Sequence, residues 1–329
     1  MIDAILLMQF SSFGDKGDMC DHAVDRRIVT IPSLNGRLRF NFVASCDNSN
    51  TMKIAATGDI HYDLIRNSAE HDKFLDFIRR LEKEKPDVLV LAGDIVGFGS
   101  SKLEECLNLF RDVAPVRLKV LGNHDYWSNE GDTFGHLEIL KSRIKGSGFK
   151  LLDEEPLIID GIGFAGNCLW YDYSFSPAET PPRSSYEKKV FGGHIIWNDV
   201  NFVRLGKTDL EYTSELRKKL EADIRTLEAK ADRIIAVTHH VGFIEMLTVR
   251  EEFPGWNFCN AFMGSRTLGE MLINHPKVRY HICGHTHEQK VVRKGSLISI
   301  NPGSTYDEKR FVSFVIAEDG SDASIEFGG

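Results

Sequence analysis

The feature that most constrains this chain is a set of short polar motifs, each of which begins where an apolar run ends. The motifs are Gly58-Asp59-Ile60-His61, Gly93-Asp94-Ile95-Val96-Gly97, Gly122-Asn123-His124-Asp125, Thr238-His239-His240 and Gly284-His285-Thr286-His287. The apolar runs have the length and the boundaries of buried strands. Ligands of α/β proteins bind outside the carboxyl ends of parallel strands, so we expect these motifs to meet at one edge of a sheet.

The segments between the first motifs predict alternating strands and helices. Strands are predicted over 53–57, 87–92 and 116–121, and helices over 70–83 and 101–112. This alternation predicts an α/β fold with a parallel sheet covered by helices. Later strands are predicted at 157–159, 162–165, 233–237, 278–282, 290–292, 297–300 and 311–316, the last of them closely spaced and antiparallel.

Two segments fall outside this alternation. One is an aromatic and helical insert at about 169–231, whose helix opens with the capping box Thr208-x-x-Glu211. The other is an N-terminal extension, residues 1–51, in which strand-like segments flank the turn signal Asn35-Gly36. The extension is either an added hairpin or a leader outside the fold. We therefore divide the chain into the extension, 1–51, and one domain over 52–329 that contains the insert.

Charge and composition limit the partners of the chain. The formal net charge of −8 argues against binding nucleic acid through its phosphates, which requires Lys and Arg. Six scattered cysteines without CxxC pairs indicate a reducing compartment. No apolar run reaches the roughly 18 residues of a membrane span, and the start of the chain does not resemble a signal peptide. We expect a cytoplasmic protein without membrane or nucleic-acid partners, and we predict no oligomeric state.

The polar residues of the motifs suit divalent metal ions. Carboxylates, amide oxygens and imidazoles favour Mn, Fe, Zn, Ni or Co. One metal takes about four protein ligands, so the candidates are too many for one ion and sufficient for two that share a carboxylate. Two metals ~3.5–4 Å apart clamp a phosphoryl group and generate a hydroxide between them. The candidate ligands are Asp59, His61, Asp94, Asn123, His239, His285 and His287.

Each motif alone has a plainer interpretation. Gly-Asp after a strand is often a turn or a helix N-cap, and the paired histidines of the last motif can be surface residues. His239 and His240 can be satisfied core histidines. The joint occurrence of the motifs, each at a strand end, favours the metal centre.

Together the motifs resemble those of the calcineurin-like metallophosphoesterases, and the resemblance covers about residues 52–316. It implies two mixed β-sheets packed as a sandwich and flanked by helices. It also implies two metals, the first held by Asp59, His61, Asp94 and His287, and the second by Asp94, Asn123, His239 and His285. The family pattern uses the first histidine after the apolar strand, so His240 is not an expected ligand.

Three further sets of residues are candidates for catalysis and substrate binding. His124 is not a metal ligand in the family, and we predict that it donates a proton to the leaving oxygen. Asp125 either orients His124 through a hydrogen bond or caps the following turn. Trp127, Trp170 and Tyr171 either wall a pocket that stacks on a flat leaving group or pack the insert as a small core.

The sequence therefore predicts metal-dependent hydrolysis of phosphate esters, with a small phosphodiester as the expected substrate and Mn, Fe or Zn as the expected metals. The short motifs look like those of the bacterial phosphodiesterase branch. No Arg or Lys lies within them to pair with the extra charge of a monoester, although Arg266 or another basic loop residue can reach in. The alternatives are a phosphomonoesterase or protein phosphatase, a nuclease, and a non-catalytic scaffold of the same fold.

Overall fold

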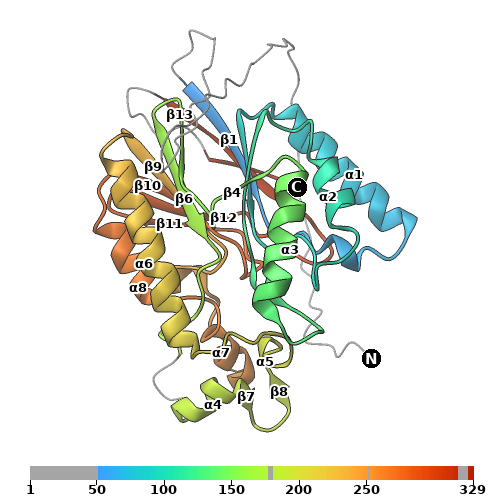
Figure 1. Cartoon of the computed structure of the whole chain (residues 1–329), viewed down its shortest axis with the longest axis vertical. Helices are drawn as coiled ribbons and strands as arrows, with labels where there is room; N and C mark the ends of the chain where they lie inside the picture. The colour runs from blue at the N-terminus through green and yellow to red at the C-terminus, as the bar shows by residue number, and fades with distance from the viewer. Residues whose placement is uncertain (1–50, 177–180, 251, 318–324) are drawn as a thin grey trace.

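The computed structural model describes residues 51–176, 181–250, 252–317 and 325–329. Within these residues, two six-stranded mixed sheets face each other and helices cover both outer faces (Figure 1). This arrangement confirms the predicted sandwich of two mixed sheets. Residues 1–50 lie outside the described residues, so the structure does not choose between an added hairpin and a leader. The division of the chain at Met52 therefore stays a prediction.

The first sheet has the strand order β14-β13-β1-β2-β3-β4. β1 to β4 are mutually parallel, and β13 runs antiparallel to both β1 and β14. All residues of β2 are buried, as expected for a parallel strand covered on both faces. The strands are β1 (Thr51–Thr57), β2 (Val88–Ala92), β3 (Val116–Val120), β4 (Lys150–Leu151), β13 (Phe311–Ala317) and β14 (Glu326–Gly328).

The second sheet has the strand order β11-β12-β10-β9-β6-β5. Its central strands β6, β9, β10 and β12 are parallel, and the edge strands β5 and β11 are antiparallel to their neighbours. The parallel strands of both sheets therefore deliver their carboxyl ends to one side of the molecule. The strands are β5 (Leu157–Ile159), β6 (Ile162–Asn167), β9 (Arg233–Thr238), β10 (Val278–Ile282), β11 (Lys290–Lys294) and β12 (Leu297–Asn301).

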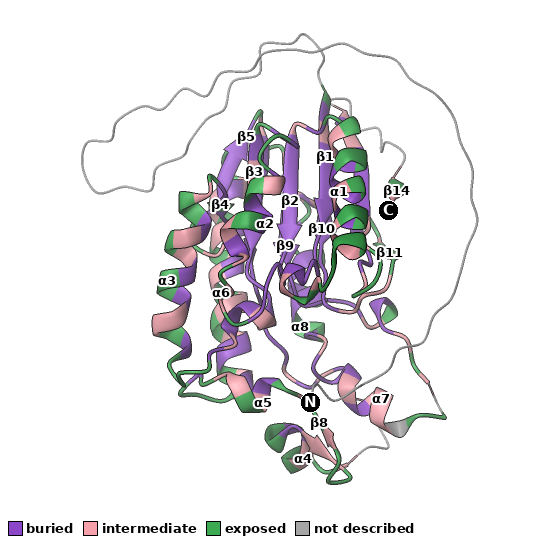
Figure 2. Cartoon of the chain, turned by 90° about the vertical axis from the view of Figure 1, so that its right-hand side faces the viewer, coloured by how far each residue is buried: buried purple, intermediate pink, exposed green. Residues whose placement is uncertain are grey.

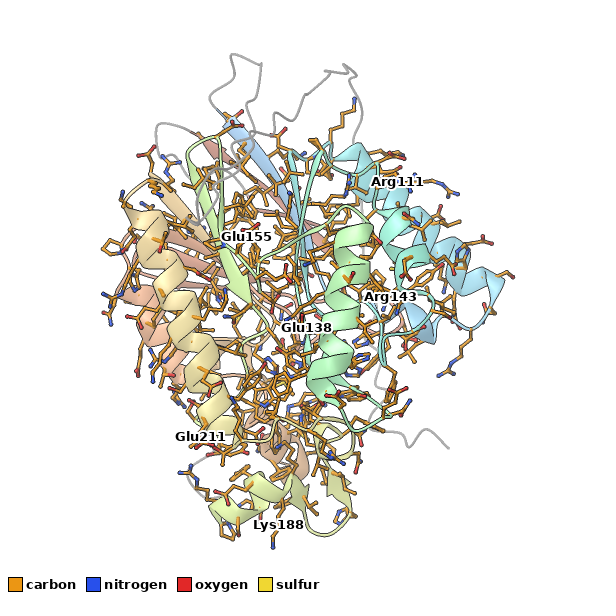
Figure 3. All side chains as sticks on the ribbon, in the orientation of Figure 1. Arg111, Glu138, Arg143, Glu155, Lys188 and Glu211 are labelled. Atoms are coloured by element: carbon orange, nitrogen blue, oxygen red, sulfur yellow. The ribbon has the colours of Figure 1, made fainter. Side chains whose placement is uncertain are left out.

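Helices pack on the outer face of each sheet. α1 (Ser68–Lys83), α2 (Leu103–Leu109) and α3 (Thr133–Gly146) cover the first sheet, and α6 (Asp209–Glu228) and α8 (Arg266–Ile273) cover the second. Figure 3 labels Arg143 on α3, whose guanidinium donates to Glu104 of α2. The predicted capping box of α6 is confirmed, since Thr208 accepts from the Glu211 amide and Glu211 accepts from the Thr208 amide.

The sequence did not indicate α3 because its apolar residues do not form one helical face. Phe134 and Ile139 of this helix are 42% and 65% exposed. These exposed apolar residues interrupt the 3.6-residue repeat of apolar positions on which the prediction of a helix depends.

The smaller elements gather beyond the carboxyl ends of the strands (Figure 2). The insert supplies α4 (Arg183–Lys188), the hairpin of β7 (Val190–Phe191) and β8 (Ile195–Ile196), and α5 (Asp199–Phe202), and α7 (Pro254–Asn260) joins them from later in the chain. Single 3-10 turns follow three strands, at η1 (Tyr62–Leu64), η2 (Asn123–Tyr126) and η3 (Ile244–Met246). No helix in the described ranges is both long enough and apolar enough to cross a membrane.

The two sheets are joined by a shared apolar core. Phe314 of β13 and Tyr280 of β10 belong to opposite sheets, and their rings stack with centroids 4.8 Å apart. Replacing Phe314 with alanine should lower the free energy of unfolding by about 3–5 kcal/mol, because the cavity between the sheets cannot collapse fully. The effect is measured by urea denaturation of the metal-free protein.

The matched control is Ile139→Ala on the exposed side of α3, which should change the free energy of unfolding by less than about 0.5 kcal/mol. Equal losses in the two variants would contradict the assignment of Phe314 to the core that joins the sheets.

Candidate metal centre

The motif residues lie in loops that leave the carboxyl ends of β1, β2, β3, β9 and β10, and hydrogen bonds join these loops across the two sheets. His239 Nδ1 donates to the carbonyl of Ala92 at 2.8 Å. The His285 amide donates across the sheets to Asp59 Oδ1 at 3.0 Å, whereas the bond from the Gly284 amide to the His239 carbonyl, at 3.0 Å, joins two loops of the second sheet. The site is therefore built between the sheets rather than within one of them.

Glycines precede the ligands because the loops are crowded. A Cβ atom on Gly122 would lie 2.1 Å from Asp94 Oδ1, and one on Gly93 would lie 2.4 Å from His239 Nδ1. Gly93 also has a φ of +91°, which L side chains rarely adopt. The Gly-Asp and Gly-Asn steps in the sequence thus reflect close packing of the ligand loops.

Several candidate ligands have left-handed backbone conformations. Their φ angles are 52° for Asp59, 44° for His61, 52° for Asp94, 71° for His285 and 56° for His287. Such a conformation costs a non-glycine residue about 1–3 kcal/mol and persists at sites where the surrounding structure enforces it. Its recurrence at these residues indicates that the chain is bent to aim their side chains at one place.

The side chains form two clusters, and His61 and Asp94 connect them, since these two residues make a third close group with His124. Ligand atoms of Asp59, His61 and His287 lie within 4.8 Å of one another, as do those of Asp94, His239 and His285. Asp94 Oδ2 lies 3.3 Å from His239 Nε2 and 3.8 Å from His61 Nε2, so one carboxylate oxygen faces both clusters. This is the position required of a bridging ligand.

Asn123 completes the second cluster. Its Oδ1 atom lies 3.1 Å from His239 Nε2, which in turn lies 3.1 Å from His285 Nδ1. These atoms converge with the Asp94 carboxylate on one point. The structure therefore brings together every ligand that the sequence predicted.

The two carboxylates titrate differently because of their neighbours. Burial raises the pKa of Asp59 to about 7, although His239 opposes the shift. Burial also acts to raise the pKa of Asp94, but the nearby His239 and His124 outweigh it and hold that pKa well below its usual range. The bridging position is thus the more strongly anionic of the two.

The imidazoles fall into two groups. Burial lowers the pKa of His61 and His285 well below the usual value and that of His287 to about 3. Burial also acts to lower the pKa of His239, but Asp94 outweighs it and raises the pKa to about 9. Neutral imidazole is the form that binds metal, so His61, His285 and His287 are already in that form at neutral pH.

An unpaired buried nitrogen tests whether the residues fit metal ions. His61 Nε2 is one of the buried atoms without a hydrogen-bond partner among the described residues, and it lies 3.8 Å from Asp94 Oδ2, inside the site. A buried polar atom without a partner is costly, and a bound cation removes that cost for a nitrogen that faces it. Buried carboxylates, an amide oxygen and neutral imidazoles are also the donor set of borderline divalent metals. The residues therefore fit two such ions.

His240 lies beside the centre but points away from it. Its Nδ1 atom donates to the carbonyl of Cys168 at 3.1 Å, and it belongs to neither ligand cluster. Burial lowers the pKa of His240 to about 3, so it packs as a neutral ring. This placement agrees with the choice of His239 over His240 as the ligand.

His124 lies at the mouth of the centre, with Nε2 3.9 Å from Asp94 Oδ2 and a partly exposed side chain. Asp125 does not orient it, and that alternative is wrong. Asp125 Oδ2 accepts from the Gly122 amide at 2.7 Å and from Lys119 Nζ at 2.8 Å, and its Oδ1 has no partner among the described residues. Asp125 therefore stabilises the turn that carries Asn123 from within it, as its third residue, and is not the N-cap of a following helix.

Trp170 and Tyr171 are not pocket walls, which corrects the prediction. Both side chains are 0% exposed, so neither ring offers a face to a substrate. The Trp170 indole donates to Asp209 Oδ1 at 2.8 Å, and the Tyr171 hydroxyl donates to Asp199 Oδ2 at 2.9 Å. These rings pack the insert against the centre, because an aromatic residue with a polar tip suits a buried position that has an acceptor nearby.

Two other aromatic rings lie at the rim. Trp127 is half-buried, and its ring stacks on His124 with centroids 3.8 Å apart. Tyr306, which the sequence analysis missed, is 55% exposed and lies 4.9 Å from the His61 ring and 4.8 Å from the His287 ring. The sequence signal for Tyr306 was the turn Asn301-Pro302-Gly303-Ser304, which follows β12. A turn at the end of this parallel strand places the next residues on the side of the sheet where the metal centre lies.

Lys309 is a basic residue that lies near the centre. Its ammonium donates to the carbonyls of Thr305 and Tyr306, and it lies 3.5 Å from the carbonyl of Asp59. Burial lowers the pKa of Lys309 to about 8. Arg266 points elsewhere, since its Nε atom donates to the carbonyl of Ser174.

Comparison with known proteins decides the family. The sequence model of the calcineurin-like phosphoesterase family matches residues 52–289 of the chain. The chain belongs to the calcineurin-like phosphoesterase family. A search of curated proteins found no match. Membership makes the chain a hydrolytic enzyme of phosphate esters, and the family implies a dinuclear site for divalent metals, which agrees with the two clusters.

Solved structures share the fold at low sequence identity. The phosphopantetheinyl hydrolase of Mycobacterium tuberculosis is 16% identical, with a TM-score of 0.60, over 78% of this chain and 91% of that one. A dimetal phosphatase from Danio rerio is 14% identical, with a TM-score of 0.48, over 83% of this chain and 98% of that one. At 16% identity, the likeness to the phosphopantetheinyl hydrolase shows a shared fold and does not choose a substrate.

The bridging position of Asp94 gives the first test of the centre. Asp94→Asn should weaken both metal sites by more than about 100-fold, since even residues behind a ligand are worth 10–100-fold in metal affinity. The variant should also lose the rise in melting temperature that metal gives the parent. Metal content after gel filtration and thermal unfolding with and without Mn²⁺ measure these effects.

The control is Asp209→Asn, which changes a buried carboxylate that belongs to neither cluster. It should keep two metals per chain. If Asp94→Asn also kept two metals, the bridging assignment would be wrong.

Proposed function

We propose that this phosphoesterase hydrolyses small phosphodiesters at a centre held by Asp59, His61, Asp94, Asn123, His239, His285 and His287. The observation that supports it best is the single Asp94 oxygen that faces both clusters. When bound, two metal ions would activate water and neutralise charge on the phosphoryl group. The chain's own part is to hold both sites rigidly from the ends of two sheets.

His124 supplies the proton in this proposal. Its ring is partly exposed at the mouth of the centre, where a leaving oxygen would lie, and its backbone amide donates to Asp94 Oδ1 at 3.0 Å. The stacked Trp127 ring restricts the orientation of the imidazole. A histidine held in this way can protonate the leaving oxygen near neutral pH.

The preference for diesters rests on the rim of the centre. Tyr306 presents an exposed ring beside two ligand imidazoles, and Trp127 lies on the His124 side. A flat group on the second ester arm can stack on such a ring. Lys309 works against this preference, because a monoester carries an extra negative charge that a nearby ammonium stabilises, although backbone carbonyls already occupy that ammonium.

Mn, Fe or Zn is the proposed metal, because the imidazole-rich donor set favours borderline ions over Mg²⁺ or Ca²⁺. We also propose a cytoplasmic location. Cys106, Cys168, Cys259 and Cys283 are free thiols in the described ranges, as is common in a reducing compartment. Nucleic acid is not a proposed partner, since the chain is acidic overall.

His124→Ala separates metal binding from catalysis. The variant should retain both metals but lose about 10²–10⁴-fold in kcat, the usual contribution of a general acid. The loss should be smaller for nitrophenyl esters than for alkyl esters, because a good leaving group needs less protonation. His194→Ala, which removes an exposed histidine of the insert, is the control. A loss that is uniform across leaving groups would assign His124 to phosphate positioning instead.

The substrate proposal is tested by a panel in the presence of Mn²⁺. A nitrophenyl diester should be hydrolysed at least as well as a nitrophenyl monoester, and Tyr306→Ala should lower kcat/KM for the diester by about 5–150-fold, the equivalent of a stacking energy of ~1–3 kcal/mol. A strong monoester preference in the parent would refute the diester proposal. The panel also includes a cyclic nucleotide, a phosphopeptide and single-stranded DNA, which report the alternative functions.

A further inference from the structure

One carboxylate of the insert is connected to the metal centre. Asp199, at the start of α5, is 1% exposed and accepts hydrogen bonds on both oxygens. Its donors are the Asn123 amide at 3.0 Å, the Trp127 indole at 2.7 Å, the Tyr171 hydroxyl at 2.9 Å and the Trp197 indole at 2.7 Å. Such charge-assisted hydrogen bonds are what make a buried carboxylate tolerable.

The hydrogen bond from the Asn123 side chain to Asp199 decides whether the oxygen or the nitrogen of that side-chain amide faces the metal centre. A carboxylate only accepts hydrogen bonds, so the NH₂ group of Asn123 must be the one that faces Asp199. The carbonyl oxygen then points the other way, toward His239 Nε2 at 3.1 Å. The reverse orientation would present an NH₂ group, which has no free electron pair for a metal. Asp199 therefore selects the ligating orientation of Asn123.

Asp199 also accepts hydrogen bonds from two tryptophans that contact other residues of the site. Through Oδ1 it holds Trp127, whose ring stacks on His124. Through Oδ2 it holds Trp197, whose ring lies edge-on to His285 with centroids 5.7 Å apart. Asp199 thus connects the insert to Asn123 directly, and to His124 and His285 through Trp127 and Trp197.

We propose that Asp199 is a positioning residue, through which the insert orients Asn123 and sets the metal affinity of the cluster formed by Asp94, Asn123, His239 and His285. Asp199 does not touch the predicted position of the metal and acts only through Asn123. The inference rests on the proposed role of Asn123 as a ligand. Residues behind a ligand typically contribute 10–100-fold to metal affinity, so the effect is large enough to measure.

The insert contains a matched control. Asp209 is also buried and also accepts from an indole and a phenol, those of Trp170 and Tyr173, and it pairs with Lys189. None of these donors is a metal ligand. Asp209→Asn therefore disturbs a carboxylate of the same kind in the same insert without altering the orientation of Asn123.

The experiment compares Asp199→Asn with Asp209→Asn by titrating the metal-free proteins with Mn²⁺, following free Mn²⁺ by its electron paramagnetic resonance. An asparagine at position 199 has only one oxygen, so one pair of donors must face its NH₂ group. Asp199→Asn should weaken one of the two sites by about 10–100-fold and leave the other unchanged. Asp209→Asn should bind Mn²⁺ as the parent does. Thermal unfolding of both metal-free variants measures what each substitution costs the fold.

Equal Mn²⁺ affinities in Asp199→Asn and the parent would overturn the proposal. So would equal weakening in both variants, because the effect would then come from the insert as a whole. Asn123→Ala tests the underlying assignment separately, since a variant that keeps two metals would remove Asn123 from the ligand set whatever Asp199 does.

A measurement on the unaltered protein covers the case in which Asp199→Asn does not fold. The side-chain NH₂ resonances of ¹⁵N-labelled Asn123 are identified by their loss in Asn123→Ala. In the metal-free and the Zn²⁺-bound parent, one of these protons should be protected from solvent exchange by its bond to Asp199. Rapid exchange of both protons would overturn the proposal.

Discussion

The structure depends on burying two carboxylates, Asp59 and Asp94, where the two sheets meet. Each is 1% exposed, and burial of an uncompensated carboxylate is strongly unfavourable. Backbone amides of His285 and His124 donate to them, and imidazoles surround them. Two bound cations would supply the remaining compensation. To bring these groups together, the motif loops need glycines where a Cβ atom would clash and left-handed backbone conformations at several candidate ligands.

The sandwich makes that convergence rigid. Parallel strands of both sheets end on the same side, and the bond from His239 to the Ala92 carbonyl crosses from one sheet to the other. The same bond keeps Nδ1 as a donor and turns Nε2 toward Asp94. Metal binding therefore has to couple to the packing of the sheets, which is why we expect bound metal to raise the melting temperature.

The insert serves the centre mainly as support. Asp199 and Asp209 each gather indole and phenol donors, so the aromatic residues between them form a buried polar–aromatic core. Trp127 and Tyr306, by contrast, are partly or largely exposed beside the centre and can contact a substrate. Differences in the insert would thus act on metal affinity through Asn123.

The sequence by itself indicated the strand-end motifs and the candidate metal ligands, because each depends on a local pattern: an apolar run, a glycine and a polar residue at a fixed offset. Local patterns indicated a parallel sheet, and the second sheet was expected from the family resemblance alone. Only the tertiary structure decided the roles of the aromatic residues. Trp170 is buried because Asp209, far along the chain, offers its indole an acceptor, whereas Tyr306 is exposed because a turn carries it to the rim. The link from Asp199 to Asn123 likewise joins residues 76 apart in the chain, and no periodicity records such a pairing.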